Sequence, residues 1–257
     1  MTNTEAVSHT RIGQVLRVTL YRPPANALGL PLVEGLEQAL DEFEKSDARV
    51  LLITSALDGF FAAGADIKLM AGATADEFAA YGEALRGPLN RLATADRPSI
   101  AAIEGLALGG GMELALACTL RVGSRSARLG LPESKLGLIP GAGGTQRLPR
   151  LVGRARALDL MLTARELSGG EAYAMGLLDR LVERGAAAET AMALAETLGR
   201  RSGAALTEIM RCVDDVFDRP LADGLARETE RVNRLFTGRE AREGLTAFLE
   251  KRRPDYA

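Results

Sequence analysis

The chain has 257 residues, 47% hydrophobic and 26% charged, with 32 Lys and Arg against 34 Asp and Glu. The apolar fraction is sufficient for a large core, and the formal net charge of −2 gives no general attraction to nucleic acid or to an anionic membrane. No apolar run approaches the roughly 18–20 residues that cross a bilayer, and the first residues lack a secretion-signal pattern. We therefore expect a cytoplasmic protein with no membrane or nucleic-acid partner, ordered except in about its first ten residues and its last few.

The single histidine and the absence of nucleotide-binding motifs limit the kinds of active site that we expect. The sole histidine, His9, lies near the expected unanchored start of the chain. This argues against a histidine-based triad or a histidine-ligated metal, and we expect no metal site. Neither a phosphate-binding GxxxxGK[ST] segment nor a GxGxxG segment after a strand occurs. Carboxylates are therefore the strongest candidates for proton transfer.

The amino-terminal half alternates short apolar runs with amphipathic stretches, the arrangement typical of an α/β protein. Pro23 and Pro24 end the first β-prone run, because proline cannot continue a paired strand. Pro31 suits the first turn of a helix. The expected elements are a strand at Val15–Leu20, a helix from Pro31 to about Lys45, a strand from Arg49 to Thr54, a loop at Phe60–Asp66 and a longer helical region ending near Ala95.

The second half repeats the strand, turn and helix pattern and then becomes helical. Ser168 and Glu171 form the pattern of a capping box, which predicts the start of a short helix. No convincing strand follows Gly185, so we expect an α/β core over residues 1–184 and a helical region over residues 185–257. The expected elements are strands at Pro98–Ile103, Leu120–Val122 and Leu129–Leu131, a helix at Gly110–Ala117, and helices around 186–200, 204–217 and 221–252, the last broken near Gly238.

Three consecutive glycines, Gly109–Gly111, end an apolar run and open an apolar helix. Glycine lets a backbone approach a ligand closely because it has no Cβ. The first N–H groups of a helix lack partners and favour negative charge. Glu113, in the first turn, adds an acid or a base. These features together suit a reaction that develops an oxyanion.

Three further segments carry residues suited to chemistry: the small-residue segment Ala62–Lys68, the pair Pro132–Glu133, and the second glycine-rich loop Gly137–Thr145. Glu113 and Glu133 belong to different elements, so only the fold could bring them together. Structural roles stay open at this point. Either glutamate could complement a helix end, and the glycines could serve only as turns.

In this order and with nearly this spacing, the four segments resemble the enoyl-CoA hydratase/isomerase (crotonase) superfamily. The resemblance covers essentially the whole chain, from Arg22–Leu28 to Glu243–Arg252, and Pro132–Leu148 is close to the family's signature. It implies an α/β fold made of a spiral of ββα units, with a helical C-terminal region that mediates trimerisation.

The resemblance also implies a reaction. Members of the family bind acyl-CoA thioesters and stabilise a thioester enolate with two backbone N–H groups, which here would belong to Ala65 and Gly110. Members that hydrate a 2,3-double bond carry two glutamates, matching Glu113 and Glu133, whereas many isomerases keep only the second. Both glutamates together favour a 2-enoyl-CoA hydratase of fatty-acid β-oxidation or related degradation. The pair would activate water for attack at C3 while Glu133 protonates C2. Coenzyme A is part of this substrate, so no separate cofactor is expected.

Further positions match the family's acyl-CoA site. The Ala63 backbone matches a position that contacts adenine, and Phe248 and Lys251 match positions that complete the site of a neighbouring subunit. A homotrimer, or a hexamer of two trimers, is therefore expected. Leu69 and Ser134 depart from the residues usual in hydratases and leave the acyl-chain preference open. The full expected set for binding acyl-CoA is Ala63, Asp66, Lys68, Gly141, Phe248 and Lys251.

Several other functions stay open. The chain could isomerise 3-enoyl-CoA to 2-enoyl-CoA, or hydrate a specialised branched or aromatic enoyl-CoA. A superfamily member binds AU-rich RNA, but the near-neutral charge and the 4% aromatic content count against that role here. An inactive structural homologue is a further alternative, and retention of both glutamates argues against it.

Overall fold

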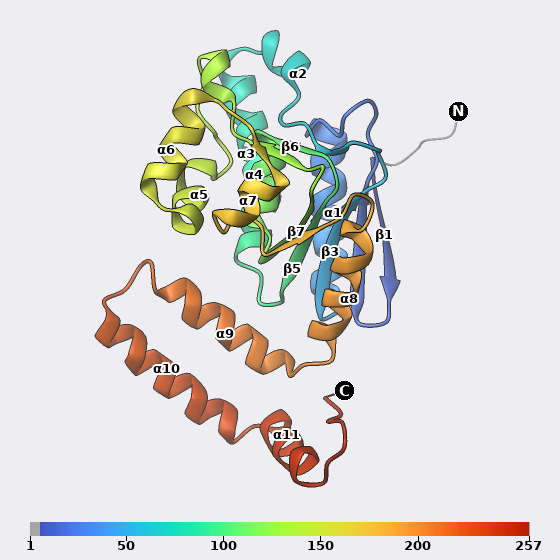
Figure 1. The fold of residues 1–257 in the computed structure, drawn as a ribbon, viewed down its shortest axis with the longest axis vertical. Coiled ribbons are helices and arrows are strands. Elements are labelled where there is room, and N and C mark those ends of the chain that lie inside the picture. The colour runs from blue at the N-terminus through green and yellow to red at the C-terminus, as the bar shows by residue number, and fades with distance from the viewer. Residues whose placement is uncertain (1–5, 257) are drawn as a thin grey trace.

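Two β-sheets form the centre of the structure, a computed structural model that describes residues 6–256 (Figure 1). Within these residues the larger sheet has six strands in the order β1-β2-β3-β5-β7-β10, and the smaller has four in the order β4-β6-β8-β9. The strands are β1 (Val7–Ile12), β2 (Val15–Leu20), β3 (Val50–Ser55), β4 (Phe60–Ala62), β5 (Ser99–Ile103), β6 (Leu106–Leu108), β7 (Leu120–Ser124), β8 (Arg128–Gly130), β9 (Leu167–Ser168) and β10 (Arg180–Val182).

Successive strand pairs contribute one strand to each sheet. The strands β3, β5 and β7 are parallel neighbours in the larger sheet. The strands that directly follow them, β4, β6 and β8, are parallel neighbours in the smaller one. Helices follow β4 and β6, and a short 3₁₀ helix follows β8. These pairings confirm the expected α/β spiral of ββα units.

Helices cover both faces of the larger sheet. Along β3, Leu51 and Ile53 belong to the main apolar core, whereas Val50 and Leu52 belong to a second core cluster. Successive side chains of a strand point to opposite faces, so β3 is buried on both sides, as its continuous apolar run predicts.

The helices are α1 (Leu30–Lys45), α2 (Ile67–Ala71), α3 (Ala75–Ala93), α4 (Gly110–Ala117), the 3₁₀ helix η1 (Glu133–Leu136), α5 (Gly144–Val152), α6 (Arg154–Thr163), α7 (Gly169–Ala174), α8 (Ala187–Gly199), α9 (Gly203–Asp215), α10 (Leu221–Phe236) and α11 (Arg239–Leu249).

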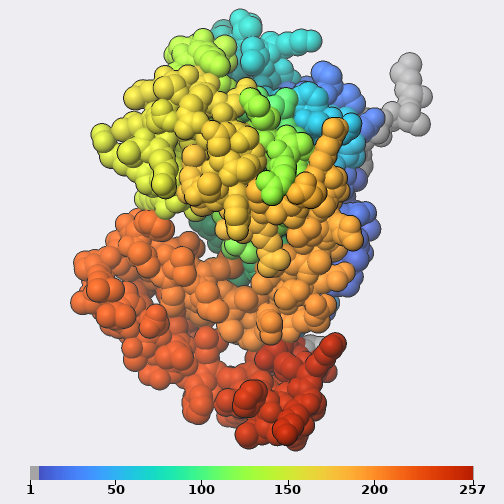
Figure 2. Space-filling model, in the orientation of Figure 1, coloured from blue at the N-terminus to red at the C-terminus, as the bar shows by residue number. Residues whose placement is uncertain are grey.

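The last three helices form an arm that extends away from the two sheets (Figures 1 and 2). The helix before them, α8, packs on the larger sheet through Ala191 and Leu194 in the second core cluster. The arm meets the core at Asp96, whose backbone oxygen accepts a hydrogen bond from Thr207 Oγ1 at 2.5 Å. Large apolar side chains are exposed along the arm: Val213, Phe217, Leu221, Leu225, Val232, Phe236, Leu245, Phe248 and Leu249.

Two local expectations are wrong. Disorder does not extend through the first ten residues, because Val7–Ile12 forms β1, which pairs with β2 and places the exposed His9 opposite Val18. Residues 1–5 and 257 lie outside the described part of the chain. The segment Phe60–Ala62 is not a loop but strand β4, because Phe61 and Ala62 are buried and the backbone pairs with β6.

The helical region expected to end near Ala95 consists of two helices, α2 and α3. Thr74 is the N-cap of α3 and forms a capping box with Glu77. The division of the chain at residue 184 stays a prediction. Within residues 6–256, every helix is too short or too polar to cross a bilayer.

Candidate active site

Three neighbouring strands of the smaller sheet bring the predicted catalytic positions together. Ala65 follows β4, Gly110 follows β6, and Glu133 follows β8. The strands β4, β6 and β8 are parallel and adjacent, and neighbouring strands are about 4.8 Å apart. The carboxyl ends of parallel strands meet at one edge of a sheet, where ligands bind in open α/β folds. The topology therefore gathers residues that are far apart in the sequence.

The backbone N–H groups of Ala65 and Gly110 lie beside each other. A Cβ atom added to Gly110 would lie 3.5 Å from the Ala65 nitrogen. The Gly64 carbonyl accepts a hydrogen bond from the Leu28 nitrogen at 2.7 Å. Because the C=O and N–H of a trans peptide point in opposite directions, the Ala65 N–H points away from Leu28. Gly110 is the first residue of α4, so its N–H points out of the helix.

Glycine is required at two positions of the Gly109–Gly111 turn. Gly109 has a φ of +51°, which side chains with a Cβ rarely adopt. At Gly111, an added Cβ would lie 2.0 Å from the Ala62 carbonyl oxygen, so only glycine lets α4 approach β4 this closely. The turn is therefore tight, as a structural role predicts, and it also places the Gly110 amide beside Ala65.

Glu113 is a buried carboxylate held by backbone amides. Its side chain projects from α4, every residue of which is buried, and the residue is 2% exposed. Its Oε1 accepts hydrogen bonds from the nitrogen of Ala142 at 2.7 Å and from that of Gly144 at 2.8 Å. Burial raises the pKa of the Glu113 carboxyl, while the Gly144 and Ala142 amides act in the opposite direction. The second glycine-rich loop therefore orients this glutamate.

Glu133 is the first residue of η1 and is partly buried. Burial raises the pKa of the Glu133 carboxyl to about 7, and the charge of Glu113 acts in the same direction. Its Oε2 is buried and has no hydrogen-bond partner within the described chain. Its Oε1 lies 3.0 Å from the position that a Cβ on Gly109 would take. This carboxyl is thus close to the Gly110 amide and can carry a proton near neutral pH.

The environments of the two glutamates differ in a way that suits acid–base chemistry. Glu113 accepts two N–H bonds, which favour its ionised form. Glu133 is buried with one oxygen unpartnered, which favours its protonated form. Pairs of titratable groups whose surroundings differ in this sense mark acid and base assignments in active sites.

Four residues expected to bind acyl-CoA lie around these loops. The Ala63 nitrogen donates to the Ala25 carbonyl at 3.0 Å, and Lys68 is exposed on α2. Gly141 is exposed next to Ala142, and its carbonyl accepts from Arg86 at 3.3 Å. Asp66 is the N-cap of α2, and its carboxylate accepts from the backbone of that helix.

The other two expected residues lie far from this edge of the sheet. Phe248 is 81% exposed in α11, and Lys251 is exposed just after it. Figure 1 shows α11 at the opposite end of the molecule from α2. A single chain therefore does not bring Phe248 and Lys251 to Ala65, and their expected role requires a neighbouring subunit.

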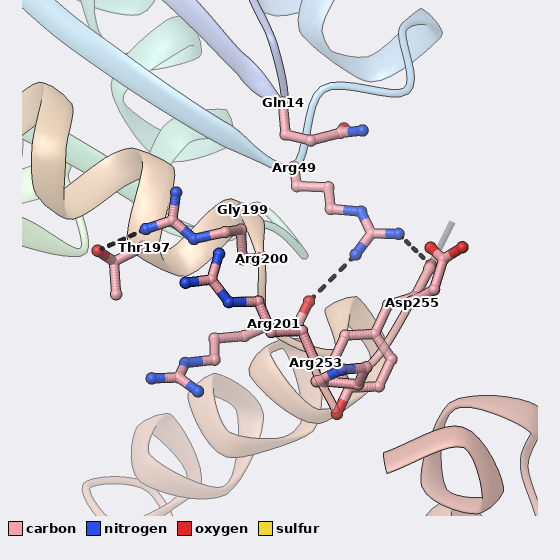
Figure 3. Close-up of a pocket in the computed structure, with 10 residues that line it drawn as sticks. Gln14, Arg49, Thr197, Gly199, Arg200, Arg201, Arg253 and Asp255 are labelled. Atoms are coloured by element: carbon pink, nitrogen blue, oxygen red, sulfur yellow. Dashed lines mark hydrogen bonds between the residues drawn. The ribbon is translucent and has the colours of Figure 1, made fainter. Parts of the chain in front are cut away.

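A separate cavity of about 610 Å³ lies at the amino-terminal ends of β2 and β3 (Figure 3). Arg49 reaches from the start of β3 and donates to the Arg201 carbonyl at 3.1 Å. Arg200 and Arg253 also line this cavity. None of the predicted catalytic residues contributes to it, so it is distinct from the candidate active site.

Sequence reasoning missed three groups that hold the site. The Ala142 and Gly144 amides belong to a loop that the sequence singled out, but backbone donors carry no residue-type signal. Tyr81, a buried residue of α3, contacts the backbone at Leu28 and Asp66 through its hydroxyl. Its position on an amphipathic helix resembles that of an ordinary core aromatic, so the sequence offers no signal for this contact.

Comparison with known proteins places the chain among acyl-CoA enzymes. The family model described as enoyl-CoA hydratase/isomerase matches residues 10–257. A Bacillus subtilis protein named probable enoyl-CoA hydratase is 40% identical over 245 residues, which cover 93% of each chain. A mouse protein named methylglutaconyl-CoA hydratase, mitochondrial, is 41% identical over 237 residues, covering 90% of this chain and 75% of the mouse protein.

A solved structure agrees with the fold described above. The crystal structure of an enoyl-CoA hydratase from Bacillus anthracis superposes with a TM-score of 0.94 at 37% identity, covering 98% of both chains. The similarity therefore includes the sheets, the loops of the candidate site and the helical arm.

Proposed function

The chain belongs to the enoyl-CoA hydratase/isomerase family, and from this premise we propose that it adds water across the 2,3-double bond of a 2-enoyl-CoA. The product is a 3-hydroxyacyl-CoA. The observation that carries the proposal is the presence of two glutamates at one site, Glu113 held by two amides and Glu133 with a pKa near 7. Hydration needs both a base for water and an acid for carbon, and this pair supplies them.

The two adjacent amides account for the electrostatic part of the reaction. Attack on C3 moves negative charge to the thioester oxygen and forms an enolate. The N–H groups of Ala65 and Gly110 are fixed before the charge appears, so no reorganisation is needed. Removal of one such donor in other enzymes costs about 2.7–4 kcal/mol of transition-state stabilisation.

The glutamates account for the proton transfers. Glu113 accepts a proton from water as the water oxygen bonds to C3. Glu133 donates its proton to C2 as the enolate collapses, so the net change adds OH to C3 and H to C2. Transfer of the captured proton from Glu113 to Glu133 restores the starting state. Two carboxylates that share one water molecule titrate as a pair.

A specialised branched substrate is the second candidate, favoured by the relative named methylglutaconyl-CoA hydratase. An assay with crotonyl-CoA, longer straight-chain 2-enoyl-CoA and 3-methylglutaconyl-CoA separates the two, because loss of the enoyl thioester absorbance reports hydration of each. A 3-enoyl-CoA in the same panel tests the isomerase alternative. The hydratase proposal is wrong if no 2-enoyl-CoA loses its absorbance.

We further propose a homotrimer or hexamer that acts in the cytoplasm in fatty-acid β-oxidation or related acyl-CoA degradation. The exposed apolar side chains of α9–α11 support assembly, because contiguous exposed apolar surface commonly marks an interface. Assembly would also let Phe248 and Lys251 reach a neighbour's acyl-CoA site. Sedimentation equilibrium measures the number of chains, and a monomer at micromolar concentration contradicts this part of the proposal.

A further inference from the structure

The hydroxyl of Tyr81 lies between two backbone segments at the edge of the candidate site. Tyr81 projects from α3 and is 5% exposed. Its Oη donates a hydrogen bond to the Leu28 carbonyl at 2.6 Å and accepts one from the Asp66 nitrogen at 3.0 Å. One buried hydroxyl therefore uses both its donor and its acceptor capacity on main-chain groups.

Two hydrogen bonds flank Ala65 in the sequence, and Tyr81 makes one of them. On one side, the Gly64 carbonyl accepts from the Leu28 nitrogen at 2.7 Å. On the other side, the nitrogen of Asp66 donates to Tyr81. Leu28 and Ala65 also form an isolated parallel β-bridge. The direction of the Ala65 N–H thus depends on the separation between its own segment and the segment around Leu28, which the tyrosine hydroxyl bridges.

The two amides of the site differ in how they are held. The Gly110 amide belongs to the first turn of α4 and to the tight packing of that helix on β4. Ala65 belongs to neither a helix nor a strand, so its position rests on individual hydrogen bonds. A change in the Tyr81 contact therefore moves the Ala65 amide relative to the Gly110 amide.

We propose that Tyr81 is a positioning residue for the oxyanion site, which aligns the Ala65 N–H with the Gly110 N–H without touching the substrate. The inference rests on the proposed hydratase function. An N–H that is displaced by a fraction of an ångström weakens its bond to the developing oxyanion more than it weakens binding of the neutral thioester. Tyr81 consequently acts on the turnover number and has little influence on substrate affinity.

The test is Tyr81→Phe, which keeps the buried ring and removes only the hydroxyl. We expect kcat for crotonyl-CoA to fall about 10- to 100-fold, the range expected for a misaligned donor, while KM changes by less than about threefold. Affinity for the enolate of acetoacetyl-CoA should fall at least about tenfold, and affinity for saturated butyryl-CoA should not change. The matched control is Tyr173→Phe, because Tyr173 is 50% exposed on α7.

A purely structural tyrosine would give a different result. Tyr81→Phe would then lower the melting temperature while kcat and the enolate affinity stayed at the wild-type values, and this outcome overturns the proposal. Crystal structures of both proteins in one crystal form give a readout that does not need turnover. We expect the Ala65 nitrogen to move relative to the Gly110 nitrogen, and an unchanged position overturns the inference. If the wild type hydrates no enoyl-CoA, the hydratase function fails, while the position of Ala65 still decides the role of Tyr81.

Discussion

The Arg22 guanidinium donates a hydrogen bond to Asp66 Oδ2 across 2.7 Å, and this contact joins the segment after β2 to the start of α2. It is the main reason why the pKa of the Asp66 carboxyl is lower than its usual value. The other carboxylate oxygen, Oδ1, accepts from the backbone nitrogens of Lys68 and Leu69. With both oxygens engaged by the chain itself, we interpret Asp66 as a support for the Ala65 loop.

Replacement of Asp66 separates this support from direct contact with CoA. Asp66→Ala removes the cap and the ion pair, and we expect a loss of about 1–2 kcal/mol in the free energy of unfolding. Asp66→Asn should lose less, because asparagine is an equally good N-cap. Urea unfolding at constant protein concentration measures both. If Asp66→Ala weakens CoA binding with no loss of stability, Asp66 binds the ligand directly.

Glu113→Gln tests the base. Glutamine can keep a carbonyl oxygen in the place of Oε1, which accepts from Ala142 and Gly144, but it cannot take a proton from water. We expect kcat for hydration to fall by about 10²-fold or more with the fold intact. Glu113→Ala should also lower stability by about 1–3 kcal/mol, because two buried amides lose their acceptor. Full activity in the glutamine variant would rule out the two-carboxylate mechanism.

Glu133 makes stability depend on pH in a predictable direction. Its pKa is about 7 in the folded chain, above the ordinary 4.5. The folded state thus binds this proton more tightly than the unfolded state, so the Glu133 contribution to stability falls as pH rises from 4.5 to 7. Between pH 4.5 and 8, the free energy of unfolding of Glu133→Gln should rise by about 1–2 kcal/mol relative to that of the wild type. This energy is reduced from the full value because the carboxyl is partly exposed and solvent screens its charge.

Urea unfolding of both proteins at several pH values measures this difference. The matched control is Glu189→Gln, on the exposed surface of α8, which removes one negative charge away from the site. If the difference in stability between Glu133→Gln and wild type stays constant from pH 4.5 to 8, burial does not raise the pKa of Glu133.

The same carboxyl sets the pH dependence of hydration. The proposed mechanism requires a protonated Glu133 to donate to C2, and burial holds its pKa at about 7. We therefore expect kcat/KM for crotonyl-CoA to decline as pH rises through about 7, since kcat/KM reports the free enzyme. Initial rates from pH 5.5 to 9 at constant ionic strength measure the profile. A rate that increases across this range would assign the acid role to another group.

Residue types and the family resemblance predicted the fold class and supplied the residues of the candidate site, but not how the fold brings those residues together. β4 and β6 have three residues each, too few to show a period of two, so the sequence did not reveal that Ala65 and Gly110 follow neighbouring strands. Long elements were easier to predict from the sequence. The amphipathic stretch that begins at Pro31 predicted α1, in which Leu32, Leu36 and Phe43 are buried.

The hydrogen bonds that backbone groups make could not be predicted from the sequence. The two amides on Glu113 have no residue-type signature, and the hydroxyl of Tyr81 is useful only because α3 places it between Leu28 and Asp66. The sequence did not predict β1, because residues 8–11 are all polar and exposed and show no alternation of apolar and polar residues. The strand is defined by its backbone pairing with β2. The partners of Tyr81 and Glu113 come from distant parts of the chain, whereas β1 depends on its neighbour β2.

Gly109→Ala tests the geometry that links the Gly110 amide to Glu133. The residue has a φ of +51°, and a strained conformation of this kind costs about 1–3 kcal/mol for a residue with a Cβ. The new Cβ would also lie 3.0 Å from Glu133 Oε1, so the carboxyl or the turn must move. We expect kcat to fall at least about tenfold, together with this loss of stability. Gly170→Ala is the matched control, because an added Cβ there meets nothing within 4 Å and φ is not positive. Wild-type turnover in Gly109→Ala would mean that neither Gly110 nor Glu133 needs its present position, and the proposed site would then be wrong.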